Sequence, residues 1–215
     1  MSPSESSSQY ESPLNGVFAP LGGDAEAALR VGAVAWAESG VTERHAHTRI
    51  RSDANGWIAT ARRAAAALQV PAMLALIGPR GTGKTQMAVE LLREYCRSGR
   101  TGVYVRTMDL LIEVRDTYGD GATRREREVL RRYRTTQLLV LDEVQVRGAT
   151  EWEQNLLTNL LDTRYAGNLS TILISNLNAA AFVASVGDSI ASRMMETGGI
   201  VECDWPSFRN MWDNV

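Results

Sequence analysis

The segment GPRGTGKT at residues 78–85 constrains this chain more than any other part of its sequence. It follows the apolar run MLALI and precedes a stretch with helical spacing, and its Gly78, Gly83, Lys84 and Thr85 fit the pattern G-x-x-x-x-G-K-[ST]. Glycines let such a loop wrap closely around phosphate oxygens and turn its amides inward, in backbone conformations that a Cβ would resist. The segment therefore predicts a strand, a phosphate-binding loop and a helix, in that order.

This loop predicts a site for ATP and Mg²⁺. We expect Lys84 to contact the β- and γ-phosphates and the Thr85 hydroxyl to ligate Mg²⁺, while the start of the following helix favours an anion. A chance match in a glycine-rich loop is disfavoured by the flanking strand and helix. The nucleotide-binding residues predicted within the loop are Gly78, Pro79, Arg80, Gly81, Thr82, Gly83, Lys84 and Thr85.

Two further apolar runs end in polar residues. LLVLDE ends in Asp142 and Glu143, and TILISN ends in Asn176. Ligands of open α/β sheets bind at the carboxyl ends of the strands, so we expect Asp142 to hold Mg²⁺ and Glu143 to act as general base on water. Asn176 could bond the γ-phosphate or that water. An acidic pair can also be a solvated strand end, and Asn can simply form a turn.

Short apolar runs alternate with helical stretches along the rest of the chain, which predicts an α/β fold with a parallel sheet covered on both faces. With 215 residues, 44% of them hydrophobic, one such domain and a short appendage fit, but a second full domain does not. Thr150 and Glu153 form a capping box ahead of four leucines that we assign to the core. The predicted strands are residues 73–77, 102–106, 138–141, 171–175 and 200–203.

Composition divides the chain into three parts. Residues 1–23 are rich in Ser, Pro and Gly and are predicted to be disordered, because they have few apolar side chains to bury. Residues 24–52 are predicted to be a short helical segment that could bind a partner, and residues 53–215 to be the ATPase domain. In the helix expected over residues 24–39, an apolar stripe of Leu29, Ala33 and Trp36 could dock on a partner or pack on its own domain.

Several classes are disfavoured. The formal charge of -2 gives no global basic field, so any DNA contact must be local. Cys96 and Cys203 lack the spacing of a disulfide framework or a zinc site. A signal peptide and a long apolar run are also missing from the sequence, so we expect a cytoplasmic protein with no membrane partner. His45 and His47 are assigned no role.

Four parts of the sequence are informative together: GPRGTGKT, LLVLDE, ILISN and the terminal stretch GDSIASRMMETGGIVECDWPSFR. In this combination the chain resembles the AAA+ helicase-loader family typified by DnaC and the related IstB-like transposition ATPases. The resemblance covers roughly residues 55–210, and the terminal stretch is its most particular part. It implies a five-stranded sheet of order 5-1-4-3-2 with nucleotide bound at subunit junctions, and hence self-association. The chain ends at Val215, so a truncated or absent C-terminal lid is expected.

The same resemblance assigns roles to individual residues. Asn176 becomes the sensor-1 residue, and Arg193 matches an arginine that reaches into a neighbouring subunit's site, where it stabilises charge on the γ-phosphate. With Glu143, these two complete the expected catalytic set. Arg164 is a second candidate for an interface arginine.

The expected partners are a replicative helicase and single-stranded DNA. Arg124, Arg127, Arg131 and Arg134 recur at three- and four-residue steps, so a helix would align them to follow a DNA backbone. Flanking arginines widen this row, and the family places a DNA-interacting insertion nearby, at about residues 108–118. Interspersed acidic residues leave a solvated face or a subunit contact as alternatives. Weaker candidates are Arg62 and Arg63.

These features favour an ATP-dependent helicase loader whose hydrolysis is weak unless it assembles with DNA or helicase. An IstB-like transposition helper is the nearest alternative. A small-molecule kinase is less favoured, because Glu143 directly after Asp142 suits water as the acceptor. A GTPase is also less favoured, because this sequence has no NKxD pattern to recognise guanine. An ATP switch without turnover stays open.

Overall fold

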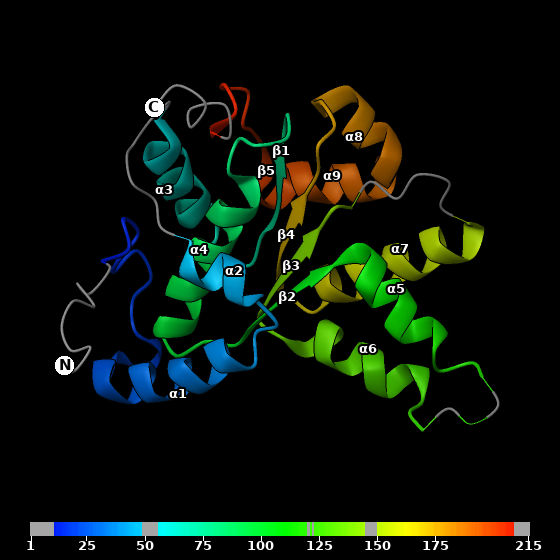
Figure 1. Ribbon diagram of the computed structural model, residues 1–215, viewed down its shortest axis with the longest axis horizontal. Helices are drawn as coiled ribbons and strands as arrows, with labels where there is room; N and C mark the ends of the chain where they lie inside the picture. The colour runs from blue at the N-terminus through cyan, green and yellow to red at the C-terminus, as the bar shows by residue number, and fades with distance from the viewer. Residues whose placement is uncertain (1–10, 49–55, 120, 122, 145–149, 209–215) are drawn as a thin grey trace, which may run out of the picture.

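The computed structural model describes residues 11–48, 56–119, 121, 123–144 and 150–208, and a single five-stranded sheet runs through these parts of the chain (Figure 1). Its order is β2-β3-β4-β1-β5, and every neighbouring pair is parallel. This confirms the expected order, and each strand lies within one residue of its predicted range. The strands are β1 (Met73–Ile77), β2 (Gly102–Arg106), β3 (Leu138–Asp142), β4 (Ser170–Ile174) and β5 (Gly199–Glu202).

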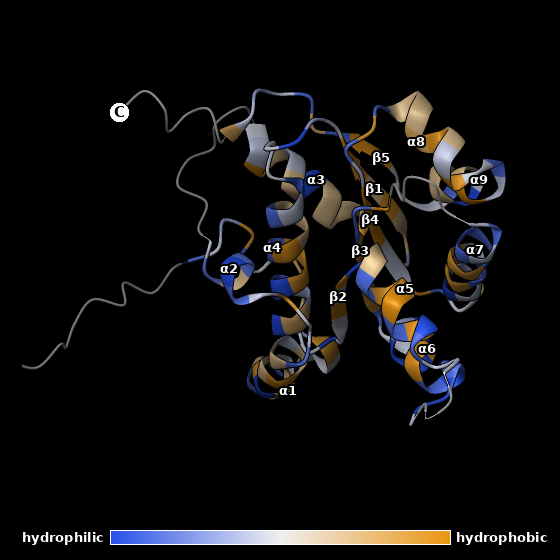
Figure 2. Ribbon diagram, turned by 45° about the vertical axis from the view of Figure 1, so that its right-hand side comes forward, coloured by the Kyte–Doolittle hydropathy of each residue, from blue (hydrophilic) through white to orange (hydrophobic). Residues whose placement is uncertain are grey.

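Helices cover both faces of the sheet, as its continuously apolar central strands require. One face carries α3 (Trp57–Ala67) and α4 (Lys84–Arg97), with α1 (Ala25–Ala37) and α2 (Glu43–His47) outside them (Figure 2). The opposite face carries α5 (Thr107–Arg115), α6 (Glu126–Thr135), α7 (Glu151–Ala166), α8 (Ala179–Val186) and α9 (Asp188–Thr197). The predicted α/β architecture is therefore confirmed. Helix α3 begins at Trp57, and residues 49–55 before it lie outside the described residues.

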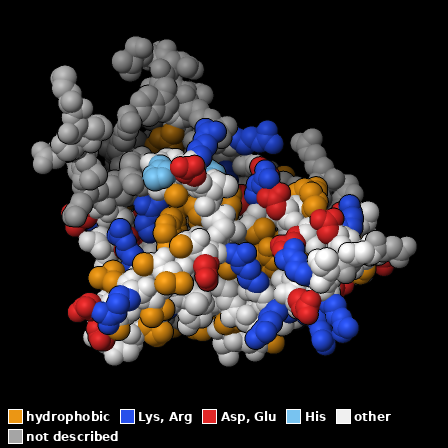
Figure 3. Space-filling model, turned by 60° about the horizontal axis from the view of Figure 1, so that its bottom comes forward, with side chains coloured by type: hydrophobic (Ala, Val, Ile, Leu, Met, Phe, Trp, Pro, Cys, Tyr) orange, Lys and Arg blue, Asp and Glu red, His pale blue; other side chains and the backbone are white. Residues whose placement is uncertain are grey.

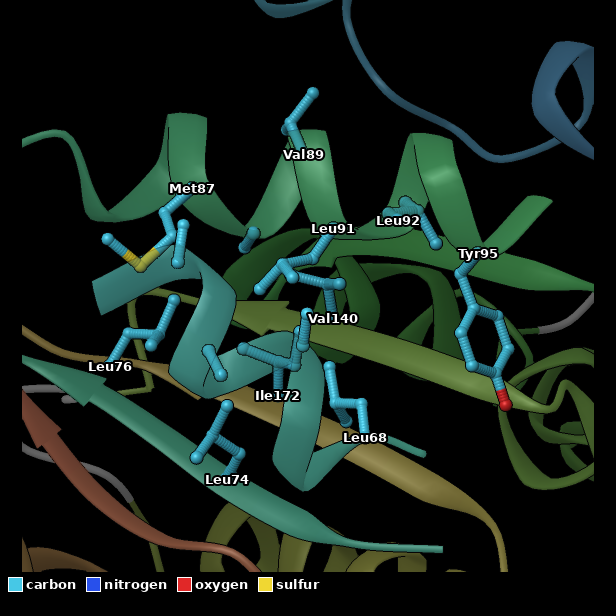
Figure 4. Close-up of a cluster of buried hydrophobic side chains, with 14 of the residues drawn as sticks. Leu68, Leu74, Leu76, Met87, Val89, Leu91, Leu92, Tyr95, Val140 and Ile172 are labelled. Carbon is cyan, nitrogen blue, oxygen red and sulfur yellow. The ribbon is translucent and has the colours of Figure 1, made fainter. Parts of the chain in front are cut away.

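Each face of the sheet has its own hydrophobic cluster. On the first face, α4 presents Met87, Leu91 and Tyr95 to strand residues such as Leu74 and Val140 (Figure 4). On the second face, the capping box of Thr150 and Glu153 starts α7, whose Leu160 and Leu161 are buried while Leu156 and Leu157 pack partly buried against the cluster. These leucines belong to the core, as predicted.

The prediction of disorder over residues 1–23 is wrong for residues 11–23, while residues 1–10 lie outside the described residues. Leu14 is fully buried, and Phe18 packs edge-on against Tyr95 with ring centroids 5.2 Å apart. Ser12 donates a hydrogen bond to the buried Glu90. The buried Leu14 and Phe18 anchor this segment in the first-face cluster, and composition alone does not reveal that they have a place to bind.

The stripe predicted for α1 is confirmed only at Trp36, which packs partly buried against the first-face cluster. The helix packs on α4 through Ala28 and Gly32, and a Cβ at Gly32 would lie 2.1 Å from the Cys96 carbonyl oxygen. Small residues let two helix backbones approach closely, so they make the closest contact here, and Trp36 adds a contact beneath the guanidinium of Arg93 on α4. Leu29 is 55% exposed, and Trp36 is half-buried. The helix thus packs on its own domain, with a second face left exposed.

Two smaller observations complete the fold. Cys96 and Cys203 are free, buried thiols on the first face of the sheet. None of the helices that the structure describes has both the length and the apolar character needed to span a membrane.

Candidate nucleotide-binding site

The loop between β1 and α4 has the conformation that its glycines predict. Gly78, Gly81 and Gly83 have φ values of 129°, 87° and 81°, in the region that side chains resist. At Gly78, a Cβ would also lie 2.4 Å from the carbonyl oxygen of Cys203, where the chain leaves β5. Substitution at these glycines would therefore both strain the loop and displace the segment beside it.

Lys84 is buried at the centre of this loop. Its Nζ donates to the carbonyl oxygens of Gly78 at 2.8 Å and Pro79 at 2.6 Å, and it lies 3.4 Å from the Thr82 hydroxyl. These oxygens hold the ammonium group where a phosphate would meet it. Phosphate binding would exchange carbonyl partners for charged oxygens, which form stronger hydrogen bonds.

Asp142, at the end of β3, joins two strands and the loop. Its Oδ2 accepts hydrogen bonds from the Thr85 hydroxyl and the Tyr104 hydroxyl, both at 2.9 Å, and the carboxylate is 5% exposed. Burial, together with this carboxylate, raises the pKa of Tyr104, so the phenol remains a hydrogen-bond donor. A carboxylate and a hydroxyl in contact are the hard oxygen ligands that Mg²⁺ prefers. The residues present therefore fit a magnesium ion held by Thr85 and Asp142.

Glu143 leaves the strand in an unusual conformation. Its φ is 56°, its side chain is exposed, and its amide donates to Asp142 Oδ1 at 2.8 Å. Thr107 holds the same turn by donating to the Asp142 carbonyl at 2.9 Å. A residue other than glycine in this region is strained, and such strain concentrates at functional sites. Asp142 is thereby held inside the site, while the Glu143 carboxylate stays accessible to water.

Asn176 lies at the same edge of the sheet. It follows β4, which pairs directly with β3, and the Val144 amide donates to the Ile174 carbonyl at 3.0 Å. The structure therefore brings Asn176 to the edge that carries the loop, Asp142 and Glu143, where it is half-buried. Its sensor role stays a prediction.

The two candidate interface arginines differ sharply. Arg164 is fully buried, and its guanidinium donates to the carbonyls of Tyr133, Thr136 and Ser170 and to the Thr171 hydroxyl. It joins the end of α6 to β4, so its assignment as an interface arginine is wrong. The buried role of Arg164 depends on acceptors from α6 and β4. The local sequence DTRY does not show that these segments surround it.

Arg193, on α9, lies nearer the surface, so its role at a subunit junction stays a prediction. It is partly exposed, forms an ion pair with Asp162 and stacks over Tyr165, with the guanidinium 5.3 Å from the ring centroid. These partners hold the arginine within its own chain. To contact the nucleotide site of another subunit, Arg193 would have to leave Asp162 and Tyr165.

Of the four arginines in the predicted row, two have side-chain partners within the chain and two are exposed. Arg127 and Arg131 are exposed on α6, whereas Arg124, before the helix, pairs with Glu113, and Arg134 donates to Asn159 at 2.8 Å. Basic and acidic side chains also lie side by side on this part of the molecule (Figure 3). Residues 108–118 are mostly the helix α5, with Met108, Ile112 and Tyr118 exposed beside α6.

Sequence reasoning missed four groups at this site. Tyr104 and His45 lie beside Asp142, with their rings 6.2 Å apart, and burial lowers the pKa of His45. Trp57 and Trp205 contact the loop itself. A tyrosine in an apolar strand and tryptophans far from the loop carry no local signal of such contacts, since only the tertiary fold brings them there.

Comparison with known proteins agrees with this geometry. Residues 50–210 match the family described as IstB-like ATP binding protein. A putative ATP-binding protein of insertion sequence IS1162 from Pseudomonas fluorescens is 36% identical over 111 residues, covering 52% of this chain and 46% of that protein. The replicative helicase loader DnaC of Escherichia coli (strain K12) is 25% identical over 134 residues, covering 62% of this chain and 54% of that protein. The chain spans about half the length of these curated relatives.

Solved structures show the same fold. The crystal structure of the DnaC helicase loader superimposes with a TM-score of 0.61 at 20% identity, covering 75% of this chain and 99% of that one. The described sheet order and phosphate loop therefore belong to the same fold as that structure. Because the family match spans residues 50–210, the chain belongs to the IstB-like ATP-binding protein family.

Proposed function

We propose that this protein is an ATP-regulated loader that binds ATP with Mg²⁺ and single-stranded DNA and delivers a replicative helicase. The observation that carries the proposal is the contact between Thr85 and Asp142 at 2.9 Å, with Glu143 exposed directly beside it. This arrangement suits transfer of a phosphoryl group to water. The relationship to the helicase loader DnaC supports the choice of cargo.

Each residue of the site has a distinct part in the proposed hydrolysis. Lys84 binds the β- and γ-phosphates, and Glu143 accepts a proton from the attacking water as general base. Thr85 and Asp142 hold Mg²⁺, which neutralises phosphate charge when bound. Asn176, at the neighbouring strand end, orients the γ-phosphate or the water.

Assembly supplies the last group. Arg193 of one subunit leaves Asp162 and Tyr165 and enters the site of the next, where its charge stabilises the transferring phosphoryl group. Hydrolysis is then slow in a single subunit and fast in an assembly. Because Arg193 has partners in its own chain, the isolated subunit hydrolyses ATP slowly in this proposal.

Two surfaces suit the partners. The exposed Arg127 and Arg131 on α6 can contact phosphates of single-stranded DNA. On α1, the apolar side chains of Leu29, Val31 and Val34 are each more than half exposed, and such side chains suit contact with a helicase. Both assignments are part of the proposal.

A transposition helper is the second candidate. It is favoured by the family match over residues 50–210 and by the 36% identity to the insertion-sequence protein from Pseudomonas fluorescens. It would use the same nucleotide site with a transposase in place of a helicase.

The test is ATP turnover by the full chain, alone and with single-stranded DNA and its host helicase. We expect the mixture to stimulate hydrolysis, and the Arg193→Ala variant to retain basal turnover but lose about 100-fold or more of the stimulated rate. Equal stimulated rates in both proteins would contradict the trans arginine. Stimulation by a transposase that is encoded next to this protein's gene, but not by the helicase, would favour the transposition helper.

A further inference from the structure

The segment that follows β5 binds the outer side of the phosphate loop. The backbone amide of Phe208 donates to the Gly81 carbonyl at 2.9 Å, and the indole Nε1 of Trp205 donates to the Thr82 carbonyl at 3.0 Å. Thr82 is fully buried beneath this contact. A buried carbonyl that loses its donor is costly, so this segment supports the loop conformation energetically.

The fit between the two segments is close. A Cβ at Gly81 would lie 1.9 Å from the Ser207 hydroxyl oxygen, so only glycine leaves room for the segment there. Further back, the Cys203 amide donates to the Ile77 carbonyl at 2.8 Å, which extends the pairing of β5 and β1 up to the start of the loop. The segment over residues 203–208 therefore follows the loop along its length.

Trp57 supports the loop from a second direction. It is almost fully buried at the start of α3, and its indole Nε1 donates to the Gly83 carbonyl at 3.3 Å. That carbonyl already accepts the Met87 amide at 2.8 Å, as expected in the first turn of α4. The indole of Trp57 is thus the weaker of the two tryptophan contacts, and Trp205 is the principal support.

Peptide planarity connects these contacts to anion binding. In a trans peptide, the C=O of one residue and the N–H of the next point in opposite directions, and the described chain has no cis peptide bond. Holding the Gly81 and Thr82 carbonyls outward therefore turns the amides of Thr82 and Gly83 to the opposite side of the loop. Successive amides that point the same way form a concavity that binds anions.

We propose that the Trp205 indole and the Phe208 amide, supported by Trp57, are positioning groups that fix the phosphate loop in its anion-binding conformation. Segment 203–208 and the phosphate chain of the nucleotide then bind cooperatively. This inference rests on the ATP site of the proposed function, and it is independent of DNA and of the helicase. Because the groups act on the loop backbone, they affect every ligand that carries the same phosphates.

The Trp205→Phe variant tests this role, since it keeps an aromatic ring and removes the N–H. We expect affinity for ATP, ADP and inorganic tripolyphosphate, measured by calorimetry with Mg²⁺, to fall by a similar factor of about 10. Trp152→Phe is the matched control, because Trp152 lies on the other face of the sheet, with its ring centroid 6.0 Å from that of Tyr118. Unchanged affinity for all three ligands, or a loss limited to adenine nucleotides, would overturn the proposal.

A second variant separates positioning from folding. Benzothienylalanine at position 205 keeps the bicyclic shape without the N–H, so it should show the same loss of affinity at a temperature where thermal unfolding shows both proteins to be fully folded. Conversely, ATP should slow amide exchange over residues 203–208 in the wild type, because coupling is reciprocal. Equal exchange with and without ATP would overturn the cooperativity while leaving the ATP site intact. Failure of the wild type to bind ATP would instead defeat the proposed function itself.

Discussion

The phosphate-loop edge of the sheet and the arginine surface of α6 hold their polar groups in opposite ways. At the edge, Lys84 and Asp142 are buried, and each is fixed by at least two hydrogen bonds. On α6, Arg127 and Arg131 are exposed. A buried, hydrogen-bonded site is organised before its ligand arrives, whereas exposed side chains gain their geometry only in a complex. Substitutions at the first region should therefore have large effects, and those at the second small ones.

Lys84→Ala should produce the largest effect. It removes the charge that the loop holds at its centre, so we expect ATP affinity to fall by about 100-fold or more, measured by calorimetry. Arg80→Ala is the matched control, because Arg80 lies exposed in the same loop and we expect only its backbone to contact phosphate. Its affinity should stay within about threefold of wild type. Similar losses in both variants would mean that loop charge in general, and not the buried lysine, binds the nucleotide.

Glu143→Gln should separate binding from turnover. The amide cannot accept the proton of the attacking water, so hydrolysis should fall by about 100-fold or more at unchanged ATP affinity. The first residue of α7, Glu151, is also exposed, and Glu151→Gln should leave both quantities unchanged. A Glu143→Gln variant with wild-type turnover would remove this carboxylate from the mechanism.

Sequence patterns predicted the strands and the loop because both depend on local information, whereas the sheet order was implied only by the resemblance to the loader family. The strand residues are apolar in short runs, and the loop glycines adopt the conformations that their spacing requires. The environment of Arg164 was not predictable in this way. Its acceptors come from α6 and β4, and one arginine in a helix looks the same in sequence whether it is buried or exposed. Leu14 and Phe18 escaped prediction for the same reason.

Tyr104→Phe should have an intermediate effect. Its hydroxyl donates to the Asp142 oxygen that also contacts Thr85, so its loss should weaken the Mg²⁺-dependent part of ATP affinity by about 3- to 10-fold. Tyr133→Phe is the control, since that hydroxyl is bonded to Glu113 on the other face of the sheet. The comparison is calorimetric, with and without Mg²⁺. An equal loss in both conditions would show that Tyr104 acts on the fold and not on the aspartate.

The arginine surface should show the smallest effect. The Arg127→Ala/Arg131→Ala double variant removes two exposed charges, so single-stranded DNA affinity should fall several-fold at low salt. The slope of log affinity against log salt should decrease by about 1.4, because each phosphate contact contributes roughly 0.7. Fluorescence anisotropy across a salt series measures both quantities.

Arg134→Ala is the internal control for this surface. Its guanidinium donates to Asn159 at 2.8 Å, so it is committed within the chain and its loss should leave the salt slope unchanged. If the double variant also kept the wild-type slope, α6 would be a solvated face or a subunit contact, and DNA would bind elsewhere. If Arg134→Ala reduced the slope by about 0.7, the value expected of one phosphate contact, the hydrogen bond to Asn159 would be shown to yield to phosphate. The surface would then be organised by DNA itself, in contrast to the phosphate loop.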